Sequence, residues 1–363
     1  MKTELLNKKF IKFLIQVTVV VAILLSLISW INTRIDASQV ITSRWHTQMA
    51  KLALNGNVVA TPENYNERVY QMAIVDEMSH IPDTIVIGCS RGMFLGEEIT
   101  GFDNLYNNGV SGACMEDYYA ILGLYEKKFS TFPKRVIIET SPWVFFAGNP
   151  EARWLENYTY SSSARRLFKK INGYELITTA KKENPYFSIP YFQYNISVLM
   201  EKGLDAFDGE PAKVSIYEAE AADYPDGSIR YKATKENRSE SRLAVVKSIN
   251  GGVTYENVIN MTEMNDEDIQ IYENLINYLS GRGTEIIIYM QPFSITQCYY
   301  IYDQNTNPAF SVVEEYLHEL GREKGIKVVG SFDSRRYNIM DDDFIDSVHL
   351  DKAGTAVVWN TDF

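Results

Sequence analysis

The chain has 363 residues, of which 45% are hydrophobic and 13% aromatic, so it carries enough apolar side chains for a large buried core and is not typical of a disordered protein. Its formal net charge is -12, and its Lys and Arg residues are scattered among acidic ones. This pattern excludes a nucleic-acid partner, because a phosphate-binding surface needs clustered positive charge. Three cysteines without a Cys-x-x-Cys pair or a Cys/His cluster exclude a disulfide-stapled domain and predict no zinc site.

An uncharged apolar segment, residues 13–31, lies near the N-terminus and is close to the roughly 20 residues that a helix needs to cross a bilayer. Four lysines precede it, so the positive-inside rule predicts that residues 1–12 are cytoplasmic and that residues 38–363 lie outside the membrane. A cleaved signal peptide is the alternative, but its apolar core is usually shorter and no clear small-x-small cleavage motif follows. We therefore predict a single-pass cell-membrane anchor.

Strand and helix patterns alternate in the remaining chain. Short apolar runs rich in β-branched residues occur at 83–88, 135–140, 284–290 and 326–331, and a weaker strand candidate lies at 103–107. Between them, apolar residues recur at helical spacing at 115–129, 265–281 and 309–325. This alternation predicts a doubly wound, flavodoxin-like α/β fold with a parallel sheet. Residues 38–81 are interpreted as helices packed on the sheet or as a stalk.

Residues 143–262 break this alternation and are interpreted as a large insertion after the third strand. The segment is rich in Tyr, Asn, Lys and Glu, has acidic Gly-containing loops, and shows a helical pattern near 163–170. Its aromatic side chains form either a sugar-stacking wall above the site or the core of the insertion. The aromatic residues in question are Trp143, Phe145, Phe146, Trp154, Tyr158 and Tyr160.

Candidate site residues follow the predicted strands, because ligands of open α/β sheets bind beyond the carboxyl ends of the strands. Ser90 lies in "GCSRG", directly after the first strand. Asp346 and His349, in "DSVHLDKAG", have a spacing that can place a carboxylate against one imidazole nitrogen and leave the other facing a hydroxyl such as that of Ser90. The alternatives are a polar turn residue for Ser90 and a helix-capping arrangement for the other two.

The neighbours of Ser90 carry alternatives of their own. Cys89 is a second possible nucleophile, although adjacent residues on a strand point to opposite faces. Arg91 is either a solvated charge or a binding residue for a substrate carboxylate or phosphate. The acidic run at 341–343 is either a cation site or a solvated loop; it lacks spaced ligands and a turn glycine, so no metal is predicted.

Three segments in order resemble the sequence blocks of the SGNH/GDSL hydrolases: "VIGCSRG", "NNGVSGA" and "DSVHLDKAG". The resemblance implies that Ser90 is the nucleophile, His349 the base and Asp346 its orienting partner. It further implies that the backbone N–H groups of Ser90 and Gly112 stabilise the oxyanion. Asn108, in the second block, is a further candidate for oxyanion or substrate binding.

The third block of that family departs from the pattern, because "ETSPW" (residues 139–143) replaces Gly-x-Asn-Asp and its oxyanion-binding Asn. Thr140 or Ser141 is expected to replace that donor, or the oxyanion hole consists of backbone groups alone. With the anchor, this ending resembles membrane-anchored cell-surface acyl-transfer proteins, such as the D-alanyl transfer protein of teichoic-acid modification.

The second resemblance implies a serine esterase or O-acyltransferase that needs no cofactor. Its expected partners are the membrane, a cell-surface glycan or acylated polymer, and a membrane-bound acyltransferase. The alternative is a catalytically degenerate SGNH-fold subunit that binds or assembles a polysaccharide acylation or export complex.

Overall fold

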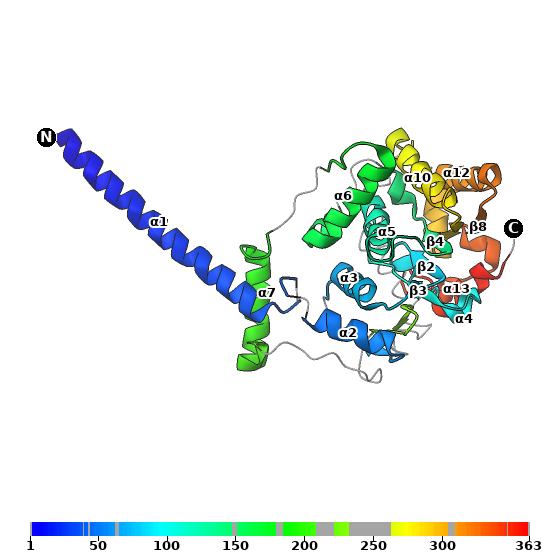
Figure 1. Cartoon of the computed structure of the whole chain (residues 1–363), viewed down its shortest axis with the longest axis horizontal. Coiled ribbons are helices and arrows are strands. Elements are labelled where there is room, and N and C mark those ends of the chain that lie inside the picture. Colours follow the sequence, from blue (N-terminus) through cyan, green and yellow to red (C-terminus); the bar gives the residue numbers. More distant parts are fainter. Residues whose placement is uncertain are drawn as a thin grey trace.

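The computed structural model describes residues 2–38, 40–42, 44–61, 65–146, 151–178, 184–207, 221–231, 263–303, 309–346 and 348–361. A long N-terminal helix, α1 (Lys2–Ile35), stands away from an α/β body, and α7 (Ile189–Lys202) crosses its end between the two (Figure 1). The helices of the body are α2 (Arg44–Leu54), α3 (Glu67–Glu77), α4 (Glu97–Thr100), α5 (Met115–Phe129), α6 (Tyr158–Asn172), α10 (Asp266–Ser280), α11 (Ile295–Cys298), α12 (Ala309–Lys324) and α13 (Lys352–Trp359).

The centre of the body is a five-stranded sheet in the order β3-β2-β4-β7-β8, and all four strand pairs are parallel. The strands are β2 (Thr84–Ile87), β3 (Leu105–Asn107), β4 (Arg135–Glu139), β7 (Glu285–Met290) and β8 (Lys327–Gly330). Numbered along the chain, this order is 2-1-3-4-5, which is compatible with a doubly wound fold of the flavodoxin-like kind. The predicted parallel α/β sheet is confirmed, and each strand is slightly shorter than its sequence pattern.

Both faces of the sheet are covered, because successive side chains of a strand point to opposite sides. In β2, Ile85 and Ile87 pack in a large cluster with residues of α5, α10 and α12. Val86, between them, packs in a second cluster with Ile99 of α4 and Val358 of α13. The continuous apolar pattern of the strands therefore reflects burial on two faces.

The segment before the sheet packs on the body, which favours the first of the two interpretations given for residues 38–81. α2 and α3 contribute buried residues to the larger cluster. Between these helices, β1 (Val59–Ala60) pairs antiparallel with β5 (Ala221–Asp223), which pairs with β6 (Ile229–Tyr231). A second, three-stranded sheet thus joins this segment to the predicted insertion.

The aromatic residues after β4 mostly form core. Phe145, Phe146, Trp154 and Tyr160 are buried, whereas Tyr158 is 78% exposed. Trp143 is half-buried and packs against the larger cluster. Among these aromatic residues, Trp143 and Tyr158 are therefore the two that present a ring surface outside the core.

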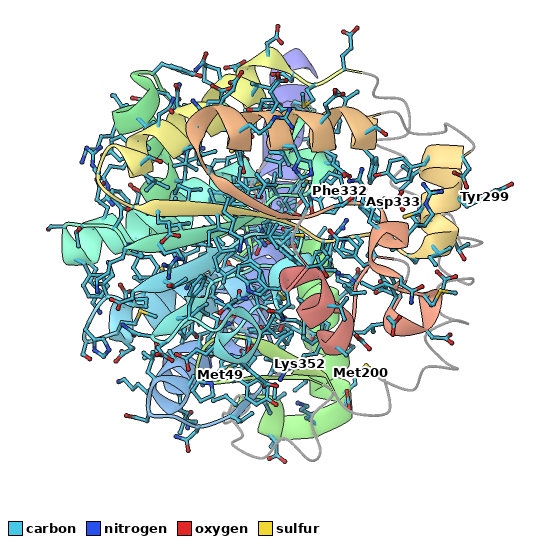
Figure 2. The ribbon with its side chains drawn as sticks, turned by 90° about the vertical axis from the view of Figure 1, so that its right-hand side faces the viewer. Met49, Met200, Tyr299, Phe332, Asp333 and Lys352 are labelled. Atoms are coloured by element: carbon cyan, nitrogen blue, oxygen red, sulfur yellow. The ribbon has the colours of Figure 1, made fainter. Side chains whose placement is uncertain are left out.

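One helix in the described part of the chain is long and apolar enough to cross a membrane, the stretch Lys9–Ile35 of α1. Its large apolar side chains from Phe10 to Leu27, and Trp30, are exposed. α13 lies at the end of the body far from α1 (Figure 1). Figure 2 turns that end toward the viewer, and α13 begins there at Lys352, shortly after His349.

Candidate active site

Ser90 lies in a sharp turn at the carboxyl end of β2. Gly88 has φ +148, and a Cβ at this position would lie 2.5 Å from Cβ of Glu139, so glycine alone fits this close approach. The chain then enters a short 3-10 helix, Ser90–Gly92. This geometry leaves Ser90 half-buried at the sheet edge and turns Cys89 into the core.

The structure brings Ser90, His349 and Asp346 into one chain of hydrogen bonds. Ser90 Oγ lies 2.7 Å from His349 Nε2, and His349 Nδ1 lies 2.7 Å from Asp346 Oδ2. The side chains of His349 and Asp346 are 27% and 38% exposed, so the group is open to solvent on one side. A hydroxyl, an imidazole and a carboxylate in this order are the parts of a serine nucleophile with its base.

The loop that carries His349 is closed by its own backbone. Phe344 and Leu350 form an antiparallel bridge, and the N–H of Ile345 donates to the carbonyl of His349. Asp346 Oδ1 accepts from the N–H groups of Val348 and His349, at 2.9 and 2.8 Å. Burial alone would raise the pKa of the Asp346 carboxyl, but these bonds and the contact with His349 lower it, which keeps the carboxylate ionised.

The segment 107–113 packs against the turn of Ser90. Asn107 Nδ2 donates to the carbonyl of Gly92 at 2.8 Å, and the N–H of Val110 donates to the carbonyl of Gly88 at 3.0 Å. Gly112 has φ +59. Among the described residues, no hydrogen-bond partner is found for the backbone N–H of either Ser90 or Gly112. Both predicted oxyanion donors are therefore unengaged within that part of the chain.

Two residues of α3, which the sequence reasoning missed, hold the residue before Gly112. The carboxylate of Glu67 accepts from both the N–H and the Oγ–H of Ser111. Arg68 donates to the carbonyl of Ser111 at 3.5 Å and forms two bonds to the buried carboxylate of Asp117, at 2.7 and 2.8 Å. No motif connects these residues to Gly112, so the sequence offered no signal for them.

The side chains of Thr140, Ser141 and Asn108 are engaged inside the core. Thr140 Oγ1 lies 2.7 Å from the hydroxyl of Tyr272, and Ser141 donates to Glu139 at 2.6 Å. Asn108, fully buried, donates to Gln71 and accepts from Tyr125, at 2.8 and 2.9 Å. This arrangement favours an oxyanion hole of backbone groups over one with a side-chain donor.

Arg91 is 1% exposed, so the interpretation as a solvated charge is wrong. Its guanidinium donates to the carbonyl of Gln291 and lies 3.6 Å from the ring centre of Phe293 and 5.7 Å from that of Trp143. Within the described residues, its Nε and Nη1 have no hydrogen-bond partner. Arg91 thus ties the turn of Ser90 to the chain after β7, and its role toward a substrate anion stays a prediction.

Cys89 is an unfavourable nucleophile in this structure. Its side chain is 2% exposed, and Sγ lies 3.4 Å from Ser141 Oγ. Burial, with the nearby Glu139 carboxylate, raises the pKa of the Cys89 thiol well above its usual value, so the reactive thiolate is scarce. The hydroxyl of Ser90 is the group that meets the imidazole.

Glu139 holds the turn that carries Ser90 through hydrogen bonds to its carboxylate. It is fully buried, and its carboxylate accepts from the N–H of Cys89 at 2.8 Å and from Ser141 Oγ. We expect Glu139→Ala to destabilise the protein by about 1–3 kcal/mol for each of the two donors left unpaired, and to slow any reaction of Ser90. Glu139→Gln keeps both partners in reach and should lose less. Thermal unfolding and the rate of Ser90 labelling measure the two effects; equal losses in both variants would contradict this role.

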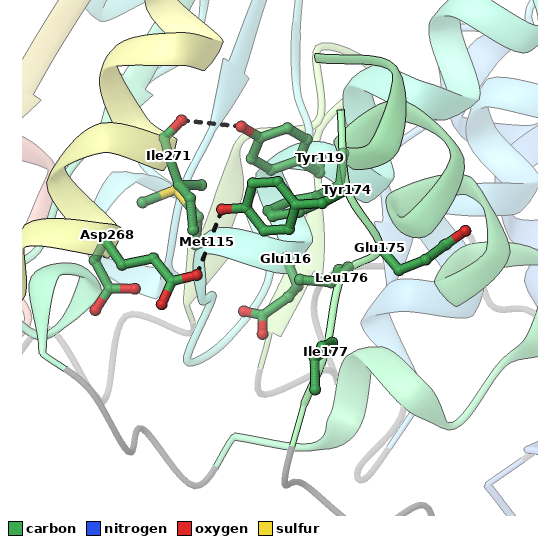
Figure 3. A pocket seen from close by; sticks show the side chains of 11 residues that line it. Met115, Glu116, Tyr119, Tyr174, Glu175, Leu176, Ile177, Asp268 and Ile271 are labelled. Carbon is green, nitrogen blue, oxygen red and sulfur yellow. Dashed lines mark hydrogen bonds between the residues drawn. The ribbon is translucent and has the colours of Figure 1, made fainter. Parts of the chain in front are cut away.

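A cavity of about 180 Å³ between α5 and α10 is a separate feature (Figure 3). It combines aromatic rings, such as that of Tyr174, with the carboxyl groups of Glu116, Glu267 and Asp268. Burial, together with Glu116 and Glu267, raises the pKa of Asp268 to about 6. Neither the serine–histidine pair nor its carboxylate lines this cavity, and its negative charge is unsuited to an oxyanion.

The acidic run at 341–343 also has structural contacts. Asp341 accepts from the N–H and the hydroxyl of Thr296, and Asp343 accepts from the N–H of Met340. No cluster of three or more potential metal ligands is found among the described residues. These contacts favour a loop held by hydrogen bonds to α11 and within itself.

Comparison with known proteins leaves this geometry as the basis for a function. No protein-family model matches the chain, and no curated protein matches it.

Proposed function

We propose that this chain is a membrane-anchored serine esterase or O-acyltransferase of the SGNH type. It acts outside the cell membrane on a cell-surface polysaccharide or a related envelope polymer, through an acyl-serine. The observation that carries this proposal is the hydrogen-bonded chain from Ser90 through His349 to Asp346 at the carboxyl end of β2. The parallel sheet with its 2-1-3-4-5 order supports the same assignment.

The geometry suits a two-step acyl transfer. Ser90 Oγ attacks the ester carbonyl carbon while His349 Nε2 takes its proton, and Asp346 stabilises the imidazolium. The N–H groups of Ser90 and Gly112 donate to the developing oxyanion. The leaving alkoxide takes the proton from His349 and departs as an alcohol. Water or a sugar hydroxyl then gives its proton to His349 and attacks the acyl-serine, and Ser90 Oγ takes that proton from His349 as it leaves.

A fluorophosphonate tests the proposal directly, because it forms a covalent bond with an activated serine. We expect the full-length protein to gain one adduct, mapped to Ser90 by mass spectrometry, and expect Ser90→Ala and His349→Ala to remain unlabelled. Circular dichroism verifies that each variant is folded. A folded wild-type protein that stays inert would overturn the enzyme proposal and favour the binding subunit.

Transfer and hydrolysis differ in what resolves the acyl-serine, and we propose that an acceptor glycan does so faster than water. We expect slow hydrolysis of p-nitrophenyl acetate and faster turnover when the right oligosaccharide is present. Trp143→Ala should remove that acceleration. The ring of Trp143 is half-buried and lies beside Arg91, the residue that follows Ser90. Tyr158→Ala is the matched control. Fast hydrolysis that no glycan changes would leave a plain surface esterase.

We further propose that α1 is an uncleaved anchor with its N-terminus in the cytoplasm. The protein should stay in membranes after alkaline carbonate extraction, and protease added to spheroplasts should digest the region after residue 38. The physical reason is the exposed apolar surface of α1, which water solvates poorly. A soluble product that has lost α1 at its N-terminus would show a cleaved signal peptide instead.

A further inference from the structure

A polar network fixes α7 across the end of α1. Asn32 Nδ2 donates to the carbonyls of Pro185 and Ser188, at 2.8 and 3.1 Å. Asn195 Nδ2, in the middle of α7, donates to Asn32 Oδ1 at 3.1 Å, and both amides are fully buried. Two buried amides whose hydrogen bonds are satisfied specify one packing arrangement, so α7 has a defined orientation relative to α1 (Figure 1).

One face of α7 contacts the chain that continues beyond α1. The hydroxyl of Tyr191 donates to Asp36 Oδ1 at 2.6 Å, and the N–H of Ala37 donates to Asn195 Oδ1 at 2.9 Å. Asp36 and Ala37 follow the last residue of α1, on the side away from its apolar span. The Tyr191 face of α7 therefore contacts the last turn of α1 and the chain that follows it.

The opposite face of α7 carries exposed apolar side chains beside one exposed Gln, and its Ile196 is half-buried against the end of α1. Ile189, Gln193, Ile196 and Met200 follow the i, i+4, i+7, i+11 spacing of one helix face. Ile189 and Met200 are 58% and 82% exposed, and Met200 projects from the ribbon in Figure 2. At roughly 100° per residue, this row lies about opposite Tyr191, and its member Ile196 packs with Ile31 and Ile35 at the end of α1.

Residues just before and just after α7 also expose apolar side chains. Phe187, before α7, is 49% exposed, and Leu204, in the 3-10 helix Gly203–Phe207 after it, is 80% exposed. The ring of Phe207 lies 6.2 Å from that of Trp30, near the outer end of the span. Aromatic rings at this level are typical of the membrane–water interface.

We propose that α7 lies in the plane of the outer membrane interface, with the side chains of Ile189 and Met200 inserted between lipid headgroups. The inference rests on the proposed anchor function of α1. A lipid bilayer is the occupant that fits, because Ile196 packs with Ile31 and Ile35 at the end of α1, which joins the exposed side chains of α7 to the apolar surface of the anchor. Such helices insert about 5–10 Å into the boundary between headgroups and acyl chains.

Site-directed fluorescence on the full-length protein in vesicles of phosphatidylglycerol and phosphatidylethanolamine tests the proposal. Met200→Cys carries an environment-sensitive fluorophore, and Glu201→Cys, one residue along and off the apolar row, is the matched control. The native thiols Cys89, Cys114 and Cys298 are buried, and the unsubstituted protein measures their background labelling. Flotation of the vesicles reports separately whether the anchor is inserted.

We expect blue-shifted emission from the label at position 200 and quenching by a lipid nitroxide near the headgroup, more than by one at the acyl-chain end. The label at position 201 should emit as in water. Protein that floats with the vesicles while both labels emit as in water would overturn the inference and leave the anchor intact. A blue shift at 200 without lipid quenching would mean that a protein covers the row, which also contradicts it. Protein that does not float would overturn the anchor and the inference together.

Discussion

Ser90→Ala is expected to lower ester turnover by roughly 10⁴–10⁶-fold, because the remaining groups bind and polarise the ester but supply no nucleophile. His349→Ala should lose a similar factor, since Ser90 Oγ then has no base within 2.7 Å. The two residues act on one step, so the double variant should be little slower than either single variant.

Turnover of p-nitrophenyl acetate, or of the acceptor-dependent reaction, measures this loss, with circular dichroism to verify the fold. Ser311→Ala, at an exposed position of α12, is the control and should keep wild-type turnover. Near-normal activity in Ser90→Ala would contradict the assignment of the nucleophile. Losses that multiply in the double variant would show that the two residues serve different steps.

The largest expected loss of stability comes from Arg68→Ala, at about 3–5 kcal/mol in the free energy of unfolding. This substitution leaves the buried carboxylate of Asp117 without its positively charged partner. Arg68 and Asp117 are 3% and 0% exposed in their side chains and lie 2.7 Å apart. Burial raises the pKa of Asp117, but the charge and hydrogen bonds of Arg68 outweigh it, and the net pKa is lowered. Without Arg68, the carboxylate must either stay charged in the core or take up a proton.

Denaturant unfolding of the two proteins near neutral pH measures this difference. Lys169→Ala removes an exposed ion pair with Glu175 and should change stability by about 0–1 kcal/mol. Because the folded pKa of Asp117 is lowered, its stabilising effect is present above the unfolded pKa of an aspartate and is lost as the pH falls through the folded value. Arg68→Ala should therefore differ least from wild type at acidic pH. A gap that widens toward low pH would contradict the pairing.

The parallel sheet and the serine–histidine pair could be predicted from local patterns. Each strand is a short apolar run, and Ser90 and His349 lie in segments whose order along the chain resembles known blocks. The supporting residues could not be predicted, because Glu67 and Arg68 reach Ser111 from a helix before the sheet. The spacing of these residues along the sequence does not indicate that they are in contact.

The third block shows a different limit of sequence reasoning. Thr140 and Ser141 have suitable hydroxyls, but a hydroxyl serves as a donor only if no nearer acceptor takes its proton. Glu139 takes the proton of Ser141, and Thr140 points to Tyr272. The strands β1, β5 and β6 were missed because two or three residues are too few to show an alternating pattern.

The amide pair Asn32–Asn195 sets an order for the biosynthesis of this protein. Its two members are 163 residues apart, so at about 5–20 residues per second the ribosome finishes Asn195 roughly 8–33 s after Asn32. In that interval the amide of Asn32 needs water, which would hold the end of α1, if it is the proposed anchor, at the membrane surface. The strands β2, β3 and β4 are made within the same interval. In the proposed topology, α1 is thus locked to α7 only after half of the chain has crossed the membrane.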